Sequence, residues 1–566
     1  MAPAITPEVA ESPITSSTEN RATGSTATHV RENLENKRIK KPKINKRKYK
    51  AKDVEPTSPF GVLEYEIKEI LHKYGLKESQ IINNMKDILN DEEIETKHHR
   101  VVKDVTILQL SSNGDGIALL HHPIKENGKQ VCIVPFGLPG DKVSVKVYKS
   151  HPKYVESDLL EIIDESHLRD NSLINCKYFG KCSGCQFQHV KYEDQLNLKK
   201  DIIRNAYRFF APTLFNKEGA LPQIDDTEPS PLKYSYRTKL TPHFNLPMRR
   251  PENFTAPTLG FGAKGRPKWR AEAEGGDYSI LDIEECPIGT KIINQGLNNE
   301  RRKFHEEYKN YKKGATFLLR ENTKCVKDDE NVELDDASMD ASGNKSAEKI
   351  KLDSGDTLVK TCVTQQRQIV SEYIEGFKFQ FSAGEFFQNN NSILPAVIAY
   401  VKSNLAIPNS KPDEPNYLVD AYCGSGLFSI TCSKNVSKVI GVEVSADSVK
   451  FAQINAEINN VKNASFIVGK AERIFGNIDT PADRTAVILD PPRKGCDHVF
   501  LNQLSDYNPA KIVYISCNVH SQARDVEWFI NRTKNGLKYE VVSVKGFDFF
   551  PQTHHVESVA VLSLKE

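Results

Sequence analysis

Two residues within the last fifty of the chain carry groups that could do covalent chemistry together. Cys517 follows the apolar run KIVYIS, and Glu557 lies in FFPQTHHVES. A thiolate is a strong nucleophile and a carboxylate can act as a general base, so the pair suits addition followed by proton removal. A cysteine at the end of a buried strand is more often a packing residue than a reactive one. A cofactor site at the same edge would favour the reactive interpretation.

A glycine-rich turn and two acids indicate such a cofactor site. The strand-like run LVDAYCGSG ends at Gly424 and Gly426, Glu443 closes the next strand, and Asp490 precedes two prolines at the end of a later one. Glycines let the backbone turn sharply toward a ligand, and an acid at the next strand end can accept from ribose hydroxyls. The turn lacks the full G-x-G-x-x-G pattern, so it suits S-adenosylmethionine better than a pyrophosphate-containing cofactor.

Four further cysteines form a second candidate site, made of Cys176, Cys182, Cys185 and, a hundred residues on, Cys286. Three nearby thiolates with a fourth brought in by folding could bind a [4Fe–4S] cluster or zinc. The spacing differs from the tighter C-x₃-C-x₂-C of radical S-adenosylmethionine enzymes. Thiols that pack without any metal are the third possibility.

The elements that must position the first site alternate over residues 376–566. The strand-like runs are YLVDA, VIGVEV, ASFIVG, AVILD and KIVYIS, with helical patterns between them. This order predicts a parallel, doubly wound α/β sheet, in which ligands bind outside the carboxyl ends of the strands. Cys517, Glu443 and Asp490 are therefore expected on one rim of the sheet.

The part before the sheet has three other patterns. Residues 58–97 show apolar residues at helical spacing, which predicts a short helical segment. Residues 98–165 contain five short β-branched runs separated by turns such as NGDG and GLPGD, which predicts an OB-like β-barrel. Such barrels often bind RNA, although a purely structural module is the alternative. Residues 166–375 are predicted to form a mixed central domain with the cysteine cluster.

Charge is distributed unevenly along the 566 residues, and the net charge of +2 hides this. Residues 1–57 are rich in Ser, Thr and Pro and then basic, with ten Lys/Arg and no acid over 37–52, which predicts a disordered tail. The basic run could be a nuclear localisation signal, an RNA-binding arm or a solvated tail. Residues 328–356 hold ten acids and three Lys and are predicted to be a disordered insertion in the central domain.

Several classes of protein are excluded by composition. No run of about eighteen apolar residues is present, so we expect no membrane-spanning helix. The N-terminus has no apolar core and carries acids, unlike a secretory signal or a good mitochondrial presequence. Eleven cysteines in so long a chain favour a reducing intracellular compartment. We expect a nuclear or cytoplasmic location, with the mitochondrion left open, and no obligate protein partner.

Five motifs, taken in order, resemble the RNA uracil-C5 methyltransferase family. They are FFQNN (386–390), VDAYCGSG (419–426), DPPRKGCD (490–497), ISCN (515–518) and THHVES (553–558). The barrel likewise resembles the TRAM domain that members of this family often carry. The resemblance implies a class I, Rossmann-like methyltransferase core, and it is strongest to the eukaryotic enzymes that modify uridine 54 of tRNA.

The resemblance also implies roles for individual residues. Cys517 would add to C6 of uracil, C5 would take the methyl group, and Glu557 would remove the C5 proton. The implied cofactor contacts are Gln388, Tyr422, Glu443 and Asp490, beside the turn at Gly424 and Gly426. Leu427 stands where the family often has Asn, so that contact is not carried over. Relatives with the same cysteine spacing hold an iron–sulfur cluster, which favours [4Fe–4S] over zinc at Cys176, Cys182, Cys185 and Cys286.

The prediction is therefore S-adenosylmethionine-dependent formation of 5-methyluridine in RNA, with tRNA as the partner and uridine 54 of the T-loop as the expected target. The target base would have to be flipped out of the folded RNA to reach the thiol. One alternative is an RNA cytosine-C5 methyltransferase, which also uses a cysteine. The other is a non-catalytic RNA-binding or tRNA-folding protein that uses the barrel and its basic surface.

Overall fold

The computed structural model describes residues 47–50, 53–247, 249–250, 252–265, 279–327, 334, 337–340, 342–407, 414–469, 475 and 478–565. The chain divides into two compact units, Met1–Lys46 and Arg47–Glu566, and the first lies outside the described residues. Most of the predicted tail over 1–57 therefore lies outside them too. Its last residues pack on the folded unit, because Arg524 forms an ion pair with Glu55 at 3.0 Å. Residues 53–57 of the predicted tail are thus part of the described folded unit.

In the described residues before the barrel lie the helices α1 (Pro59–Lys73), α2 (Glu78–Ile81), α3 (Met85–Asn90) and α4 (Glu92–His98). The first begins at Ser58, whose side chain accepts a hydrogen bond from the Gly61 amide, and has a proline in its first turn. Its apolar stripe, which includes Ile67 and Ile70, packs on the outer face of the barrel at Ile117 and Val131. The helical pattern in the sequence thus buries one face of α1.

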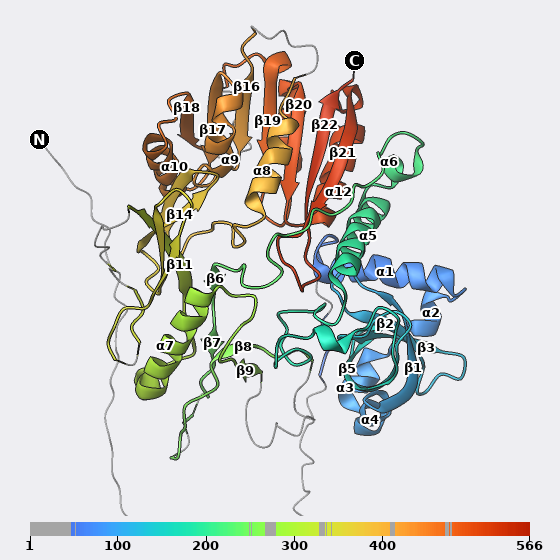
Figure 1. The fold of residues 1–566 in the computed structure, drawn as a ribbon. Coiled ribbons are helices and arrows are strands. Elements are labelled where there is room, and N and C mark those ends of the chain that lie inside the picture. Colours follow the sequence, from blue (N-terminus) through green and yellow to red (C-terminus); the bar gives the residue numbers. More distant parts are fainter. Residues whose placement is uncertain are drawn as a thin grey trace, which may run out of the picture. The chain divides into compact units, whose positions relative to one another are not determined.

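Five strands form a closed barrel, as the sequence analysis predicted (Figure 1). They are β1 (Val101–Leu110), β2 (Gly116–His121), β3 (Lys129–Val134), β4 (Lys142–Ser150) and β5 (Tyr154–Asp164). All neighbours are antiparallel except β3 and β5, which run parallel. Alternate residues of every strand fill the interior, among them Val105, Ala118, Cys132, Val145 and Val155. This period of two is the pattern that the β-branched runs indicated.

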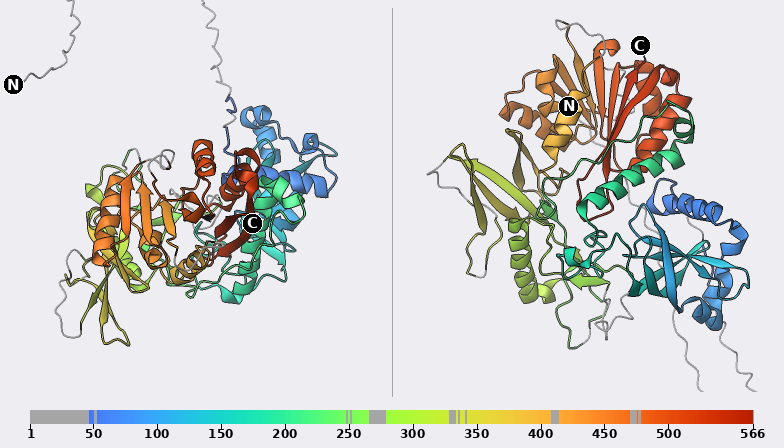
Figure 2. Two further views of the ribbon diagram at one scale, coloured as in Figure 1. Left: turned by 90° about the horizontal axis from the view of Figure 1, so that it is seen from above. Right: turned by 45° about the vertical axis from the view of Figure 1, so that its right-hand side comes forward.

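The central region combines two long helices with small sheets. Its elements are α5 (Tyr192–Phe210), α6 (Pro212–Asn216), β6 (Lys239–Leu240), β7 (His243–Phe244), β8 (Gly260–Gly262), β9 (Ile280–Asp282), α7 (Lys291–Glu307), β10 (Ala315–Thr316), β11 (Leu319–Val326), β12 (Ala347–Lys351) and β13 (Thr357–Val363). Strands β10-β7-β8-β9 form one sheet and β12-β13-β11-β6 another. Figure 2 shows α5 in green beside the red strands of the C-terminal sheet.

Two predictions for this region were wrong: the disorder of the whole acidic stretch and the position of one domain boundary. Within the acidic stretch over 328–356, residues 347–351 form β12, which pairs along its whole length with β13. The strand lies at a sheet edge, where charged side chains can reach solvent and so are tolerated. The domain boundary predicted between 375 and 376 cuts a hairpin of β14 (Ile369–Ile374) and β15 (Phe377–Ser382). That hairpin turns at Glu375 and Gly376, both of which have positive φ.

The C-terminal region is a seven-stranded sheet of order β18-β17-β16-β19-β20-β22-β21 (Figure 1). Strands β16 (Tyr417–Ala421), β17 (Lys438–Glu443), β18 (Ala464–Val468), β19 (Thr485–Leu489) and β20 (Lys511–Ser516) are parallel. Strand β22 (Glu557–Leu564) is antiparallel to both β20 and β21 (Tyr539–Phe547). The order reverses at β16, which makes its carboxyl end the expected ligand crevice. The predicted Rossmann-like α/β core is confirmed.

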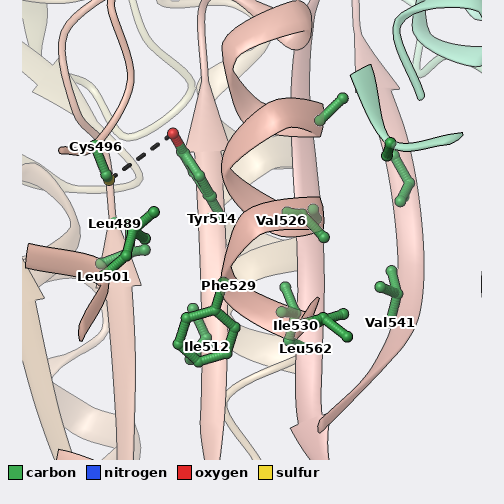
Figure 3. Close-up of a cluster of buried hydrophobic side chains, with 14 of the residues drawn as sticks. Leu489, Cys496, Leu501, Ile512, Tyr514, Val526, Phe529, Ile530, Val541 and Leu562 are labelled. Atoms are coloured by element: carbon green, nitrogen blue, oxygen red, sulfur yellow. Dashed lines mark hydrogen bonds between the residues drawn. The ribbon is translucent and has the colours of Figure 1, made fainter. Parts of the chain in front are cut away.

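Helices cover both faces of this sheet. They are α8 (Leu394–Ser403), α9 (Leu427–Thr431), α10 (Ala446–Ile458), α11 (His498–Tyr507) and α12 (Val519–Arg532). Leu418 packs in a core with α8 and α9, whereas the next residue, Val419, packs in a core with α5, α11 and α12. Figure 3 shows the second core, where Val526 and Phe529 of α12 lie over the strands. Burial on both faces explains why these strands read as continuous apolar runs.

Among the helices that the structure describes, none combines the length and the apolar composition that a membrane span requires.

Candidate active site

The glycine turn lies at the carboxyl end of β16. Tyr422, Gly424 and Gly426 all have positive φ, at 72°, 53° and 91°. A Cβ on Gly426 would lie 3.1 Å from the Ile430 side chain and 3.3 Å from that of Ala452, so this glycine lets α9 pack closely on α10. A Cβ on Gly424 would meet nothing within 4 Å. The backbone at Gly424 is therefore open to a ligand.

Glu443, at the end of β17, is joined directly to this turn. Its Oε2 accepts a hydrogen bond from the Gly424 amide at 3.2 Å, and its Oε1 accepts one from the Ser445 amide at 2.9 Å. Asp420, inside β16, instead accepts from the backbone and hydroxyl of Ser429 and supports the start of α9. Burial raises the pKa of Asp420 to about 7. A hydrogen bond thus joins the glycine turn to Glu443 at the point where the order of the parallel strands reverses.

Cys517 and Glu557 lie opposite each other at the ends of two paired strands. In the antiparallel pair of β20 and β22, Ser516 lies opposite Ser558. The same register, continued by one residue, places Cys517 opposite Glu557. Residues directly opposite in an antiparallel pair have Cβ atoms roughly 5 Å apart. The structure therefore brings the predicted nucleophile and the predicted base together, forty residues apart in the chain.

Burial and mutual repulsion dominate the electrostatics of this pair. Burial, followed by the carboxylates of Glu557 and Asp490, raises the pKa of the half-buried Cys517 thiol to about 12. Burial also raises the pKa of Glu557 to about 8 and that of Asp490 to about 7, and Asp490 adds to the shift at Glu557. In the ligand-free protein these groups resist ionisation. A cation bound next to them would lower all three pKa values.

Arg493 supplies positive charge to this cluster, and the sequence analysis missed its role. Its positive charge lowers the pKa values of both Cys517 and Glu557. Its backbone carbonyl accepts a hydrogen bond from the side chain of Asn518 at 2.9 Å. Arg493 follows Asp490-Pro491-Pro492 in the DPPRKGCD motif. Its position in the DPPRKGCD motif was the sequence signal from which a role in the site could have been predicted.

Asn518 also fixes the loop that carries Cys517. Its Oδ1 accepts from the His520 amide and so caps α12, while its Nδ2 donates to the carbonyl of Thr57 at 3.1 Å. The residues just before α1 are thereby joined to the nucleophile loop.

The segment before Glu557 is held by one face of α5. Lys199 and Asp548, both fully buried, form an ion pair, and Lys199 also donates to the carbonyl of Phe550 at 3.0 Å. The Tyr192 hydroxyl donates to Asp548 at 2.9 Å. Removing one partner of a buried pair is costly, so this network constrains the backbone that leads to the base.

Gln388 lies in the loop between β15 and α8 and is buried. The side chains of its neighbours hold this loop to three elements. Arg320 of β11 donates to Asn389 Oδ1 at 3.1 Å, Asn390 donates to the carbonyl of Phe549 at 3.0 Å, and Asn391 donates to Glu372 of β14 at 2.8 Å. Through Asn390 the Gln388 loop is connected to the segment that leads to Glu557.

All four predicted metal-ligating cysteines line one cavity of about 400 Å³ and are free thiols. Burial raises the pKa of Cys286 to about 11, and the neighbouring thiols Cys182 and Cys176 add to this shift. Within the described parts of the chain, no three His, Cys, Asp or Glu side chains are arranged to hold a single metal ion. The amides of Gln186 and Phe187, next to Cys185, donate to the carbonyl of Gln552 at 3.0 and 2.9 Å. The cysteine loop is thus joined to the segment before Glu557.

Comparison with known proteins gives consistent matches. Residues 329–565 match the family model described as tRNA (Uracil-5-)-methyltransferase, and residues 97–160 match the TRAM domain. The tRNA (uracil(54)-C(5))-methyltransferase of Saccharomyces cerevisiae is 56% identical over 541 residues, covering 93% of this chain and 84% of that protein. The Schizosaccharomyces pombe protein of the same name is 42% identical, covering 93% and 87%.

A solved structure of similar fold is the Pyrococcus abyssi tRNA (uracil-54, C5)-methyltransferase in complex with S-adenosyl-L-homocysteine. It has a TM-score of 0.54 and 22% identity, covering 81% of this chain and 100% of that one. This likeness concerns the fold.

Proposed function

The chain belongs to the tRNA (uracil-5-)-methyltransferase family, and we propose that it methylates C5 of uridine 54 in tRNA with S-adenosylmethionine as methyl donor. The observation that carries the proposal is the register of β20 and β22, which makes Cys517 and Glu557 neighbours. The two yeast relatives that share most of its length carry the activity in their names.

Cys517 acts in the first step of the reaction and Glu557 in the last. The Cys517 thiolate bonds to C6 of uracil, and the electron pair of the C5–C6 double bond moves onto C5 and O4. C5 then bonds to the methyl carbon as the bond from that carbon to the sulfonium sulfur of the donor breaks, which leaves a neutral thioether. Glu557 takes the C5 proton, the double bond re-forms, and the C6–S bond breaks to release the cysteine. Arg493 favours the thiolate by its positive charge.

The cofactor would lie over the glycine turn. S-adenosylmethionine supplies the methyl group from a sulfonium, which carries positive charge. The open backbone at Gly424 gives room for a ligand, and Glu443 is placed to accept from the ribose hydroxyls. We place Gln388, Tyr422, Gly426 and Asp490 in the same site. The acidic group of Asp490, Glu557 and Cys517 suits a cation, which would lower their raised pKa values.

For the cysteine cavity we propose a [4Fe–4S] cluster rather than zinc. Four free thiols share one cavity, and the resemblance of the cysteine spacing to that of relatives with iron–sulfur clusters favours iron–sulfur over zinc. A cubane cluster binds each of four thiolates on a different iron. Iron and sulfide assays on anaerobically purified protein test this, and zinc without labile sulfide would contradict it.

Methylation of a defined set of tRNA transcripts with labelled cofactor tests the function. We expect label in 5-methyluridine at position 54 of wild-type transcripts and none in transcripts with cytidine at that position. Label in 5-methylcytidine would instead support a cytosine-C5 enzyme. If a Cys517→Ala variant fully restored growth of cells that lack the protein, tRNA binding would be its main role.

The proposed compartment is intracellular and reducing, which the eleven free thiols support: nucleus, cytoplasm or both, with the mitochondrion left open.

A further inference from the structure

A cavity between the start of α1 and the outer face of the barrel lies outside the site described above. Its volume is about 380 Å³. Its walls come from the start of α1, from the loop between β1 and β2, and from the ends of β4 and β5 on either side of their connecting turn. In OB-like barrels, the loops after the first and the fourth strands are the ones that hold oligonucleotides. The cavity therefore stands where this class of fold binds nucleic acid.

Aromatic rings line the cavity. Phe60 stands at its rim with 61% of its surface exposed, although it is in the first turn of a helix that buries its other apolar residues. Tyr148 and Tyr154 form the wall on the β4 and β5 side, and the Tyr154 ring stacks on His151 with centroids 4.2 Å apart. Aromatic faces of this kind stack nucleobases that have left their own helix.

Asp115, at the base of the cavity, is an acceptor with spare capacity. It is only 8% exposed. The Lys264 ammonium donates to its Oδ2 at 3.0 Å and lies 2.8 Å from its Oδ1, so both oxygens are close to the cation. Each carboxylate oxygen has two lone pairs, so Asp115 can accept a further hydrogen bond. The ion pair neutralises the carboxylate, so RNA phosphates nearby are not repelled.

Glu156 is a second acceptor in the same wall. Burial opposes its ionisation, but hydrogen bonds from His151 and Lys149 lower its pKa to about 2, so it stays ionised. Its Oε2 accepts from the Tyr148 hydroxyl at 3.1 Å and keeps a further lone pair. Carboxylates only accept, so the two acids together select a base that donates. Adenine, cytosine and guanine have exocyclic amino groups, and uracil has none.

The β1–β2 loop connects this cavity to the candidate active site. A Cβ on Gly114, in that loop, would lie 2.9 Å from His554 Cβ and 3.1 Å from Gln186 Cβ. His554 lies three residues before Glu557, so the loop that lines the cavity packs on the segment that carries the base. An RNA seated at Cys517 can extend to the cavity along this contact.

We propose that the barrel cavity takes one further nucleobase of the tRNA substrate, distinct from the methylated uridine and bearing an exocyclic amino group. The base stacks on Phe60 and the tyrosines and donates its amino group to Asp115 and Glu156. The identity of the RNA rests on the proposed function, but the binding does not depend on methyl transfer. The contact fixes which nucleotide can reach Cys517.

Binding of tRNA to the full-length protein, measured without S-adenosylmethionine, tests the stacking. Phe60→Ala should weaken binding roughly tenfold, since base–aromatic stacking has an effect of that order. Ile124→Ala is the matched control, because Ile124 is 53% exposed on the same barrel and outside the cavity. It should change the dissociation constant less than about twofold. Equal effects of the two substitutions would overturn the proposal.

A second experiment tests whether binding depends on the exocyclic amino group of the base. T-arm RNAs in which single loop bases are replaced by analogues without the amino group are compared with the parent RNA. We expect one position at which the loss weakens binding to the wild type about tenfold, and Asp115→Asn should reduce that difference to below about threefold. If all analogues bind like the parent, the proposal is wrong. Absence of methylation by the wild type would contradict the proposed function and leave these binding results intact.

Discussion

The two halves of the seven-stranded sheet build their parts of the site in different ways. In the parallel half, the glycine turn follows β16 and Glu443 ends the neighbouring strand β17, and a hydrogen bond from the Gly424 amide joins the two loops. In the antiparallel part, Cys517 directly follows β20 and Glu557 begins β22, and the pairing of Ser516 with Ser558 beside them brings the proposed nucleophile and base together. Variation in a loop of the first half changes one contact, whereas a register slip in the second half would separate the reacting pair. We therefore expect substitutions in the two halves to affect different steps.

The largest effect should come from Cys517→Ala. Without the thiol no covalent addition occurs, and we expect methyl transfer to fall by at least about 10⁴-fold, as for other enzymes that lose a nucleophile. Cofactor affinity, measured by calorimetry, should stay within about twofold, because the glycine turn belongs to the other half. Measurable turnover above background would contradict the assignment.

Glu557→Gln should have the next largest effect, with turnover reduced about 10³-fold. Addition and methyl transfer remain possible, but the C5 proton stays, so a covalent protein–RNA adduct should accumulate. Denaturing gels with labelled tRNA detect such an adduct. Cys517→Ala combined with Glu557→Gln is the control and should give none. Clean turnover with no adduct would rule out Glu557 as the base.

Arg493→Gln should lower turnover roughly 10- to 100-fold, the range for a lost hydrogen bond to a charged group. A base must be ionised to act, so the rate of the wild type should rise with pH through the pKa of Glu557, about 8 in the ligand-free protein. Because Arg493 lowers that pKa, its removal should shift the rise to higher pH. Arg493→Lys is the matched control and should recover part of the shift. A pH profile identical to that of the wild type would contradict this role.

Glu443→Gln should have the smallest effect and a different signature. It weakens an acceptor for the cofactor ribose, so the KM for S-adenosylmethionine should rise roughly tenfold while turnover at saturation changes little. Steady-state kinetics at varied cofactor concentration measure this. A fall in turnover with unchanged KM would show that the two halves are not separable in this way.

The parallel half could be predicted from the sequence because its signals are local. Each strand is a short apolar run, and the residue proposed to be functional lies at the end of the run, as at Glu443. The placement of Glu557 beside Cys517 could not be read in the same way. It depends on β22 entering between β20 and β21, which no local pattern specifies.

Other features were missed for related reasons. The ion pair of Lys199 with Asp548 joins residues about 350 positions apart, and a lysine in a helix pattern reads as exposed. Strand β12 was hidden because an edge strand needs no apolar side and can be as acidic as a loop. Arg493 lay inside a recognised motif, but only the folded geometry shows that its charge acts on Cys517.

The position of β22 has a consequence for the order in which the protein is made. Strand β21 emerges from the ribosome before β22, yet β22 occupies the place between β21 and β20. Until it inserts, β20 presents an unpaired edge, which is a template for wrong pairing with another chain. The insertion that closes this edge is also the event that delivers Glu557 to Cys517. A chain that has not completed its sheet therefore lacks the proposed base beside the proposed nucleophile, so completion of the sheet would also be the step that activates the protein.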